Sequence, residues 1–236
     1  MTSVRTIGHG RAGGALALAL AAAGWDVLPS LGRTDDPTAA AEGVDLLVLA
    51  TPDAVIADVA AGVRPSDTTV VAHLSGSLGL TPLAAHPRRA VVHPLAALPD
   101  AERGAERLRG AWFGLAADGD PLGAAVVEAL EGRAVTVAEG DWVRYHAAAA
   151  MAANHLVALL GQVERVADSV GVPLAAYLDL ARGSLADVAA LGPAAALTGP
   201  VRRGDRATVE AHLAALPPEE RAGYEAMARE AARLCP

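Results

Sequence analysis

The sequence predicts an α/β domain built on a mainly parallel sheet, followed by an all-helical domain, and three observations support this. Short β-rich runs alternate with alanine- and leucine-rich helical stretches through the first half of the 236 residues. Several of these runs are continuously apolar, which is typical of parallel strands covered on both faces. From Asp141 onward the pattern is helical. We therefore expect domains at residues 1–138 and 139–236.

The strands follow from apolar β-type runs separated by Gly-, Pro- and Asp-rich connectors. The expected strands are Val4–Ile7, Asp26–Leu31, Asp45–Ala50, Thr69–Leu74, Ala90–His93 and Trp112–Ala116, with Ala134–Val137 as an edge strand. The helical half starts with a helix over Trp142–Val170, about 43 Å long at about 1.5 Å per residue. Asp141 is its expected N-cap and Gly171 its stop signal. Further helices are expected at Pro173–Leu191, Asp205–Leu216 and Pro218–Leu234.

Composition excludes several classes of function. All 19 basic residues are arginine, so Schiff-base and P-loop lysines are absent, and Cys235 as the one cysteine rules out an internal disulfide and a cysteine-based metal site. A net charge of −8 and 3% aromatic residues argue against nucleic-acid binding. The histidines lack metal-site spacing, and we infer no metal.

The N-terminus has an alternative interpretation as a targeting signal, because Arg5 and Arg11 precede an uncharged stretch over residues 12–25. That stretch is shorter than the roughly 18 residues that span a membrane. The β-type run Val4–Ile7 and the spacing of the following glycines favour a retained N-terminus. We expect a cytoplasmic protein without a membrane segment.

A glycine-rich loop follows the first expected strand. The residues Gly8-His9-Gly10-Arg11-Ala12-Gly13 fit the pattern G-x-G-x-x-G, and a helix and a second strand come next. In this context the first glycine makes the tight turn, the second lets the backbone approach a pyrophosphate, and the third lets the helix pack closely on the strand. The loop therefore predicts a Rossmann-like domain that binds a dinucleotide.

The end of the second strand indicates which dinucleotide. An NAD site places Asp or Glu there to bond the ribose hydroxyls. Here Arg33 lies 20 residues after Gly13 and Thr34 follows it. A guanidinium suits a 2′-phosphate, so we predict NADP(H). Asp35 and Asp36 follow closely and argue against this preference for NADP(H), unless they are simply solvated charges of the loop. The alternative interpretation of Arg33 is an exposed arginine without a ligand.

Ligands of open parallel sheets bind beyond the carboxyl ends of the strands. The expected cofactor residues there are Thr51, Pro52, Asp53, Ser75 and Gly76. His93 at a strand tip is a candidate substrate-binding residue. His73 lies inside an apolar strand, and we interpret it as a hydrogen-bonded core histidine.

These residues resemble the 6-phosphogluconate dehydrogenase-like superfamily, and within it a bacterial family of Rossmann-like proteins with a poorly characterised helical C-terminal half. The resemblance covers nearly the whole chain. It rests on residues 8–13, 50–53, 73–77, 145–148 with Asn154, and 197–205. Relatives include ketopantoate reductases, pyrroline-5-carboxylate reductases and hydroxyisobutyrate dehydrogenases. The resemblance implies a homodimer whose clefts take residues from both halves.

One departure from the superfamily affects the chemistry. Its hydroxyacid dehydrogenases carry Lys-x-x-x-Asn on the long helix, and here Asn154 fits the asparagine while Ala150 occupies the lysine position. We take Asn154 and His146 as the candidate catalytic residues. The alternatives are a helix–helix hydrogen bond for Asn154 and a partly exposed helix residue for His146.

Arg202 and Arg203 are candidate ligands for a substrate carboxylate, although such a loop can simply turn the chain. We predict an NADPH-dependent reductase acting on a C=O or C=N bond of a small carboxylate-bearing metabolite, with ketopantoate-type reduction as its most specific form. The alternative, from a different class of function, is that the protein is a non-catalytic NADP(H)-binding sensor or assembly partner. Reduction of a larger redox carrier is a third hypothesis.

Overall fold

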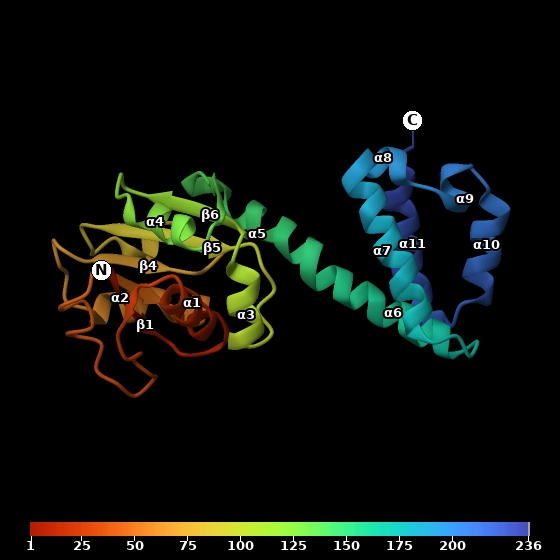
Figure 1. The fold of residues 1–236 in the computed structure, drawn as a ribbon. Coiled ribbons are helices and arrows are strands. Elements are labelled where there is room, and N and C mark those ends of the chain that lie inside the picture. Colours follow the sequence, from red (N-terminus) through yellow and green to blue (C-terminus); the bar gives the residue numbers. More distant parts are fainter. Residues whose placement is uncertain (236) are drawn as a thin grey trace. The chain divides into compact units, whose positions relative to one another are not determined.

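A computed structural model describes residues 1–235, and the chain divides into two compact units, one from Met1 to Ala150 and one from Met151 onward. The first unit contains a seven-stranded sheet and the second is helical (Figure 1). The predicted fold class, a Rossmann-like α/β domain followed by an all-α region, is confirmed. The predicted domain division at residue 138 stays a prediction.

The sheet has the strand order β2-β1-β3-β4-β5-β6-β7. All neighbours are parallel except β5 and β6, which makes the sheet mainly parallel as predicted. Each predicted strand is present, with the bounds β1 Ser3–Ile7, β2 Asp26–Val27, β3 Leu46–Leu49, β4 Val70–His73, β5 Arg89–Pro94, β6 Trp112–Ala117 and β7 Arg133–Thr136. The order places β7 at one edge, as expected.

β2 is shorter than the predicted strand over Asp26–Leu31. Its ladder stops after Val27, and an isolated bridge joins Leu31 to Ile7. The backbone N–H of Leu28 donates to the carbonyl of Val4, but the next donor to β1 is Leu31 rather than Ser30, so one extra residue breaks the regular spacing of the ladder. The strand tip nevertheless stays beside β1, because the backbone N–H of Gly8 donates to the carbonyl of Leu31 at 2.8 Å.

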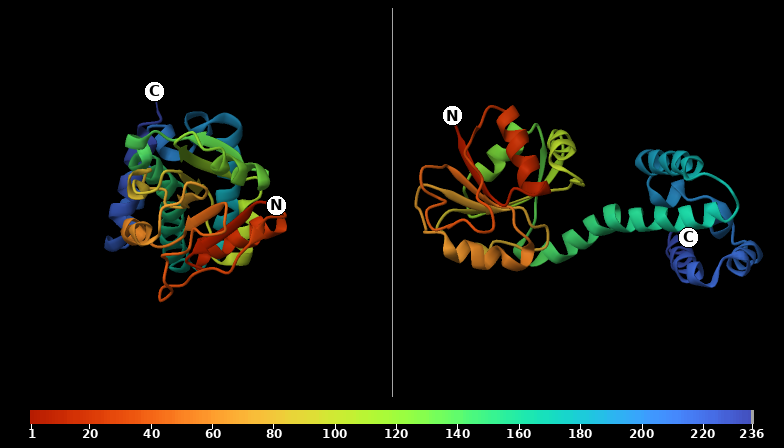
Figure 2. Two further views of the ribbon diagram at one scale, coloured as in Figure 1. Left: turned by 90° about the vertical axis from the view of Figure 1, so that its left-hand side faces the viewer. Right: turned by 90° about the horizontal axis from the view of Figure 1, so that it is seen from below.

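Helices cover both faces of the sheet. One face packs against α1 (Arg11–Ala22), α3 (Ala101–Leu108) and α4 (Leu122–Ala129), and the other against α2 (Ile56–Gly62). Figure 2 shows α2, in orange, across the sheet from α1, in red. The apolar strand residues are buried between these layers, for example Leu46 and Val48 toward α1 and Leu47 and Leu49 toward α2. The short 3-10 helices are η1 (Asp53–Val55), η2 (Thr81–Leu83) and η3 (Glu139–Asp141).

The first unit ends with α5 (Trp142–Ala150), which follows η3 directly. Trp142 is buried and packs with Val91 of β5 and Val137. This contact places the first turns of α5 against the sheet. The predicted N-cap, Asp141, instead lies in the last position of η3, and its carboxylate pairs with Arg144.

The second unit begins with a π-helical segment, η4 (Met151–His155), which interrupts the regular α-helix that the sequence predicts over Trp142–Val170. The following helices are α6 (Leu156–Asp168), α7 (Leu174–Leu191), α8 (Pro193–Ala196), α9 (Gly199–Arg202), α10 (Arg206–Ala215) and α11 (Pro218–Ala232). The predicted helices correspond to α7, α10 and α11, and α8 and α9 were not predicted. Gly171 adopts φ +71° beyond α6, which confirms the stop signal.

The helices of the second unit pack loosely in the single chain. Glu220 of α11 is buried and accepts a hydrogen bond from Arg165 of α6 at 2.5 Å. By contrast, α7 has no buried residue, and Leu180 and Leu185 are 67% and 64% exposed. No helix among residues 1–235 is both long and apolar enough to cross a membrane. The homodimer that the resemblance implies stays a prediction.

We expect Gly13→Ala to destabilise the fold strongly, because a Cβ at this position would lie 2.0 Å from the carbonyl oxygen of Gly8 and 2.9 Å from Ala50 Cβ. Backbone atoms cannot yield as a side chain can, so we expect a loss of at least about 2 kcal/mol in the free energy of unfolding. Urea denaturation followed by circular dichroism measures this loss. Gly10→Ala is the matched control, since a Cβ there meets nothing within 4 Å. Equal stability of the two variants would contradict the close packing.

Candidate functional site at the carboxyl edge of the sheet

The glycine loop connects β1 to α1 at the carboxyl edge of the sheet. Gly8 adopts φ +98°, a conformation that favours glycine, and a Cβ there would lie 2.6 Å from the carbonyl oxygen of Ala50. Gly13 is buried against Gly8 and Ala50 in the first turns of α1. The loop therefore brings α1 against the ends of β1 and β3, as the motif predicts.

Within residues 1–235, no side chain caps the N-terminus of α1. Gly10 is its N-cap and provides no side-chain hydrogen bond, and no acidic residue lies in the first turn. His9, Gly10 and Arg11 are exposed, Ala12 is partly buried, and the space beside Gly10 is open. Unpaired N–H groups at a helix N-terminus favour an anion, since the helix dipole adds a partial positive charge there.

The tip of β2 presents Arg33 and Thr34. Both are exposed, and neither side chain bonds to another residue in the part of the chain that the structure describes. The two aspartates that follow are engaged locally. Asp35 accepts from the backbone N–H of Gly32 at 2.7 Å, and Asp36 accepts from the backbone and hydroxyl of Thr38, which lowers the pKa of its carboxyl group. These carboxylates therefore stabilise the turn.

The ends of β3 and β4 are joined by a hydroxyl–carboxylate network. Asp53, which follows Pro52 at the start of η1, accepts from the hydroxyls of Ser75 and Ser77, each at 2.7 Å. The hydroxyl oxygen of Thr51 is buried and has no partner among residues 1–235. The structure thus brings the predicted residues Asp53 and Ser75 together, and it leaves a polar group of Thr51 available at the same edge.

His73 is a hydrogen-bonded core histidine, as the sequence predicts. It is fully buried in β4, its Nε2 lies 2.8 Å from the carbonyl oxygen of Gly79, and its Nδ1 accepts from the backbone of Ser75. Burial lowers the pKa of its imidazole. Both ring nitrogens are used, so His73 shapes the β4 turn.

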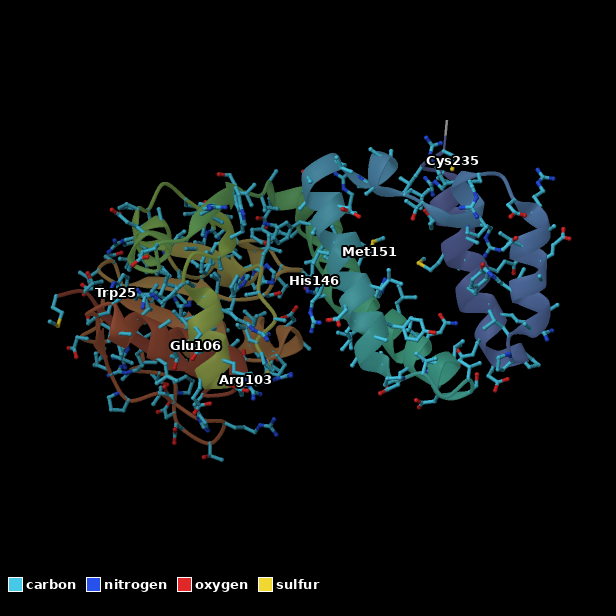
Figure 3. All side chains as sticks on the ribbon, turned by 45° about the vertical axis from the view of Figure 1, so that its right-hand side comes forward. Trp25, Arg103, Glu106, His146, Met151 and Cys235 are labelled. Carbon is cyan, nitrogen blue, oxygen red and sulfur yellow. The ribbon has the colours of Figure 1, made fainter. Side chains whose placement is uncertain are left out.

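Two histidines meet above Gly76, and a tyrosine contacts one of them. A Cβ on Gly76 would lie 2.6 Å from Nε2 of His93 and 2.7 Å from Cδ2 of His146, so this position requires glycine. His93 Nδ1 lies 2.9 Å from the hydroxyl oxygen of Tyr145. The rings of His93 and His146 meet edge to face with centroids 5.8 Å apart. Figure 3 shows His146 on α5 beside the sheet.

Burial affects the protonation of two members of this cluster, His93 and Tyr145. Burial, and next the neighbouring His146, lower the pKa of His93 to about 4. Burial also raises the pKa of the Tyr145 hydroxyl to about 12. At neutral pH His93 and Tyr145 are therefore uncharged hydrogen-bonding groups, and His93 lies next to Gly76.

Three predicted site residues belong to the second unit. Asn154 is exposed in the π-helical segment, and π-helical segments occur frequently at functional sites. Arg202 ends α9 and Arg203 is its C-cap, and both side chains are exposed. Gly204 and Asp205 turn the chain into α10, where Asp205 accepts from the backbone N–H of Thr208. The substrate roles of Asn154, Arg202 and Arg203 stay predictions.

Sequence reasoning missed three residues near this edge. Tyr145 and Ser77 lie within the segments that carry the family resemblance, but the sequence assigns them no role, and it assigns none to Glu139. The Glu139 carboxylate accepts from the backbone of Leu80 at 2.9 Å and from the hydroxyl of Thr81 at 2.8 Å, which anchors the loop after β4 to η3. Ser75 and Ser77 flank Gly76 directly after a buried strand, and this pattern could have indicated a role for Ser77.

The fold is shared with solved structures across nearly the whole chain. A Bacteroides fragilis protein provisionally named an NADP oxidoreductase matches at 20% identity, covering 98% of both chains with a TM-score of 0.78. An Aspergillus terreus reductive aminase in complex with NADPH and ethyl-5-oxohexanoate matches at 18% identity, covering 99% of this chain and 94% of that one with a TM-score of 0.70.

A Plasmodium falciparum pyrroline carboxylate reductase with NADP bound matches at 14% identity, covering 99% of this chain and 98% of that one with a TM-score of 0.64. At these identities the similarity establishes the fold alone. No curated protein sequence matches the chain significantly. One family matches residues 112–231, from β6 to α11. The chain belongs to this family, described as Domain of unknown function (DUF2520).

Proposed function

We propose that the crevice beside the glycine loop binds NADP(H). The observation that supports this most is the uncapped N-terminus of α1, held at the carboxyl edge with open space at Gly10. The buried, unpartnered hydroxyl of Thr51 at the same edge also fits a polar ligand. Two of the similar structures were solved with NADPH or NADP bound. On the same grounds we place the chain in the 6-phosphogluconate dehydrogenase-like superfamily.

In our proposal, different residues of this edge bind different parts of the cofactor. The loop from Gly8 to Gly13 would hold the paired phosphates, and Arg33 with Thr34 would hold the 2′-phosphate. The residues of the β3 and β4 ends would hold the nicotinamide side; they are Thr51, Pro52, Asp53, Ser75 and Gly76. The bound cofactor would supply a hydride.

We propose further that the protein is an oxidoreductase that reduces a C=O or C=N bond in a small carboxylate-bearing metabolite. The supporting observation is that His93 and His146 converge on Gly76, next to the proposed cofactor site, and that Tyr145 contacts His93. These groups bind and orient a polar substrate atom and exclude water from one side of it. His93 then binds substrate, and His146 and Asn154 assist the reaction. Ketopantoate-type reduction is the most specific form, and it rests on the resemblance.

A non-catalytic NADP(H)-binding sensor or assembly partner is the second candidate. The observation that favours it is Ala150, which occupies the position of the superfamily's catalytic lysine in a chain without any lysine. The cofactor crevice is common to both candidates, so turnover distinguishes them.

Arg33→Asp should change the preference for the cofactor. The variant removes the cation proposed to bind the 2′-phosphate and provides a carboxylate for the ribose hydroxyls, so we expect the ratio of the NADPH to the NADH dissociation constant to rise by roughly tenfold or more. Fluorescence titration measures both constants. Arg64→Asp makes the same charge change at an exposed arginine that pairs with Glu42, and should leave the ratio unchanged. An unchanged ratio in Arg33→Asp removes the assignment.

Turnover should appear when the protein is mixed with NADPH and a panel of keto and imino acids. The absorbance of the reduced cofactor follows the reaction. We expect His146→Ala and Asn154→Ala each to lower kcat by roughly tenfold or more, as for groups that bind the reacting atoms. His212→Ala, on exposed α10, is the control. Tight NADPH binding without oxidation of NADPH by any substrate would support the non-catalytic candidate.

A further inference from the structure

We propose that Tyr145 is a positioning residue whose hydroxyl donates to Nδ1 of His93 and thereby holds His93 as the neutral Nε2–H form, ready to donate to a carbonyl oxygen. This inference rests on the proposed reductase function and deepens it, because it selects carbonyl substrates over imines. Nothing in the sequence pattern connects residue 145 to residue 93.

The position of the tyrosine hydroxyl is fixed on several sides. The ring of Tyr145 packs edge to face on the buried ring of Trp142, with centroids 5.4 Å apart. It meets the ring of His93 in the same manner, also at 5.4 Å. Gly114 of β6 is paired with His93 of β5, and a Cβ on it would lie 2.5 Å from the hydroxyl oxygen of Tyr145. The hydroxyl is thus confined between β6 and His93.

The direction of the hydrogen bond follows from the available partners. Within residues 1–235, the hydroxyl oxygen of Tyr145 forms no hydrogen bond with any group other than His93. The phenolic proton then needs an acceptor of its own, and Nδ1 of His93 lies 2.9 Å away. A neutral imidazole that accepts at Nδ1 carries its proton on Nε2.

The charge state of the pair agrees with this direction. The pKa of His93 is lowered to about 4 by burial, with smaller contributions from His146 of α5 and His73 of β4, while the nearby Asp53 opposes the shift. The pKa of Tyr145 is raised to about 12, so the phenol keeps its proton. Below about pH 6.5 an ordinary histidine becomes charged, whereas His93 in the folded chain stays neutral until about pH 4.

The Nε2–H group is directed to the place where chemistry is proposed. Nε2 of His93 lies against the Gly76 backbone, one residue from the Ser75 side chain that bonds Asp53. Within residues 1–235 no acceptor is hydrogen-bonded to this nitrogen, so it is available to a ligand. The donor therefore lies at the carboxyl edge beside the proposed nicotinamide site.

The preference for carbonyl groups follows from their lone pairs, which can accept a hydrogen bond from the Nε2–H group of His93. A carbonyl oxygen accepts an N–H hydrogen bond, and it gains negative charge when the bond is reduced, so a fixed donor stabilises it increasingly along the reaction. A protonated imine has no free lone pair on nitrogen and carries positive charge, so the same donor gives it no acceptor contact. A neutral histidine in this form thus acts as a fixed hydrogen-bond donor to oxygen.

The tautomer can be measured without a substrate. Long-range proton–nitrogen NMR of the full chain with labelled histidine distinguishes the Nδ1–H, Nε2–H and charged forms, and loss of signals in His93→Gln assigns the residue. We expect the neutral Nε2–H form from about pH 8 to about pH 5, where an ordinary histidine is mostly charged. In Tyr145→Phe we expect the Nδ1–H form to become populated, since its acceptor bond is lost.

A matched control exists in the second unit. Tyr224 places its hydroxyl oxygen 2.7 Å from Nδ1 of His212, with the rings 5.7 Å apart, so Tyr224→Phe removes an equivalent contact. This variant should change the signals of His212 and leave those of His93 unaltered. The proposal is overturned if wild-type His93 is in the Nδ1–H or charged form at about pH 7, or if Tyr145→Phe leaves its tautomer unchanged.

Kinetics test the substrate class separately. A keto acid and a cyclic imino acid of similar size are compared, and Tyr145→Phe should lower kcat for the keto acid by roughly tenfold or more while leaving the KM for NADPH unchanged. A preference for the imino acid, or equal kcat in Tyr145→Phe and wild type, overturns the assignment to carbonyl substrates. Absence of turnover with both compounds counts against the reductase proposal, while the NMR result still decides the role of Tyr145.

Discussion

The close approach of the glycine loop to the end of β3 is the constraint on which the rest of this site depends. Gly13 packs so near Gly8 and Ala50 that no side chain fits between them. This packing presses the first turns of α1 onto the carboxyl edge of the sheet, where its unpaired N–H groups face outward. A looser contact would move the partial positive charge of the helix away from the residues at the ends of β3 and β4.

The same edge holds a second cluster of polar side chains. Ser75 and Asp53 bond to each other at the ends of β4 and β3, and Gly76 leaves room for His93 and His146 above the backbone. Trp142 supports this arrangement from α5, because its burial against β5 fixes the turn that carries Tyr145. One edge of the sheet therefore carries both the uncapped N-terminus of α1, where we propose that phosphates bind, and a second cluster of hydrogen-bonding side chains.

Much of the fold could be predicted because its signals are local. Continuous apolar runs defined β3 and β4, and Gly171 with Pro173 ended the helix that contains α6. The glycine spacing likewise predicted the loop geometry at Gly8 and Gly13.

Other features depend on how the helices and strands pack against one another, and they could not be predicted from the sequence. Whether Tyr145 or His146 reaches His93 depends on how α5 rotates against β5 and β6, and Trp142 fixes that rotation. The interruption of the helix at η4 leaves no mark in its alanine-rich sequence. The role of Asp35 was also undecided, because only the folded turn shows that its carboxylate accepts from Gly32.

The proposed site depends above all on the glycine loop, which we propose binds the phosphates of a nicotinamide dinucleotide. Isothermal titration of NADPH into the full chain tests it most directly, with Gly10→Ala as the comparison because its methyl group enters open space where the phosphates are proposed to lie. We expect saturable binding of one cofactor per chain, weakened at least about tenfold in the variant, which is a loss of about 1.4 kcal/mol in binding free energy. Failure of the wild-type protein to bind NADPH, or equal affinity in the variant, would contradict it.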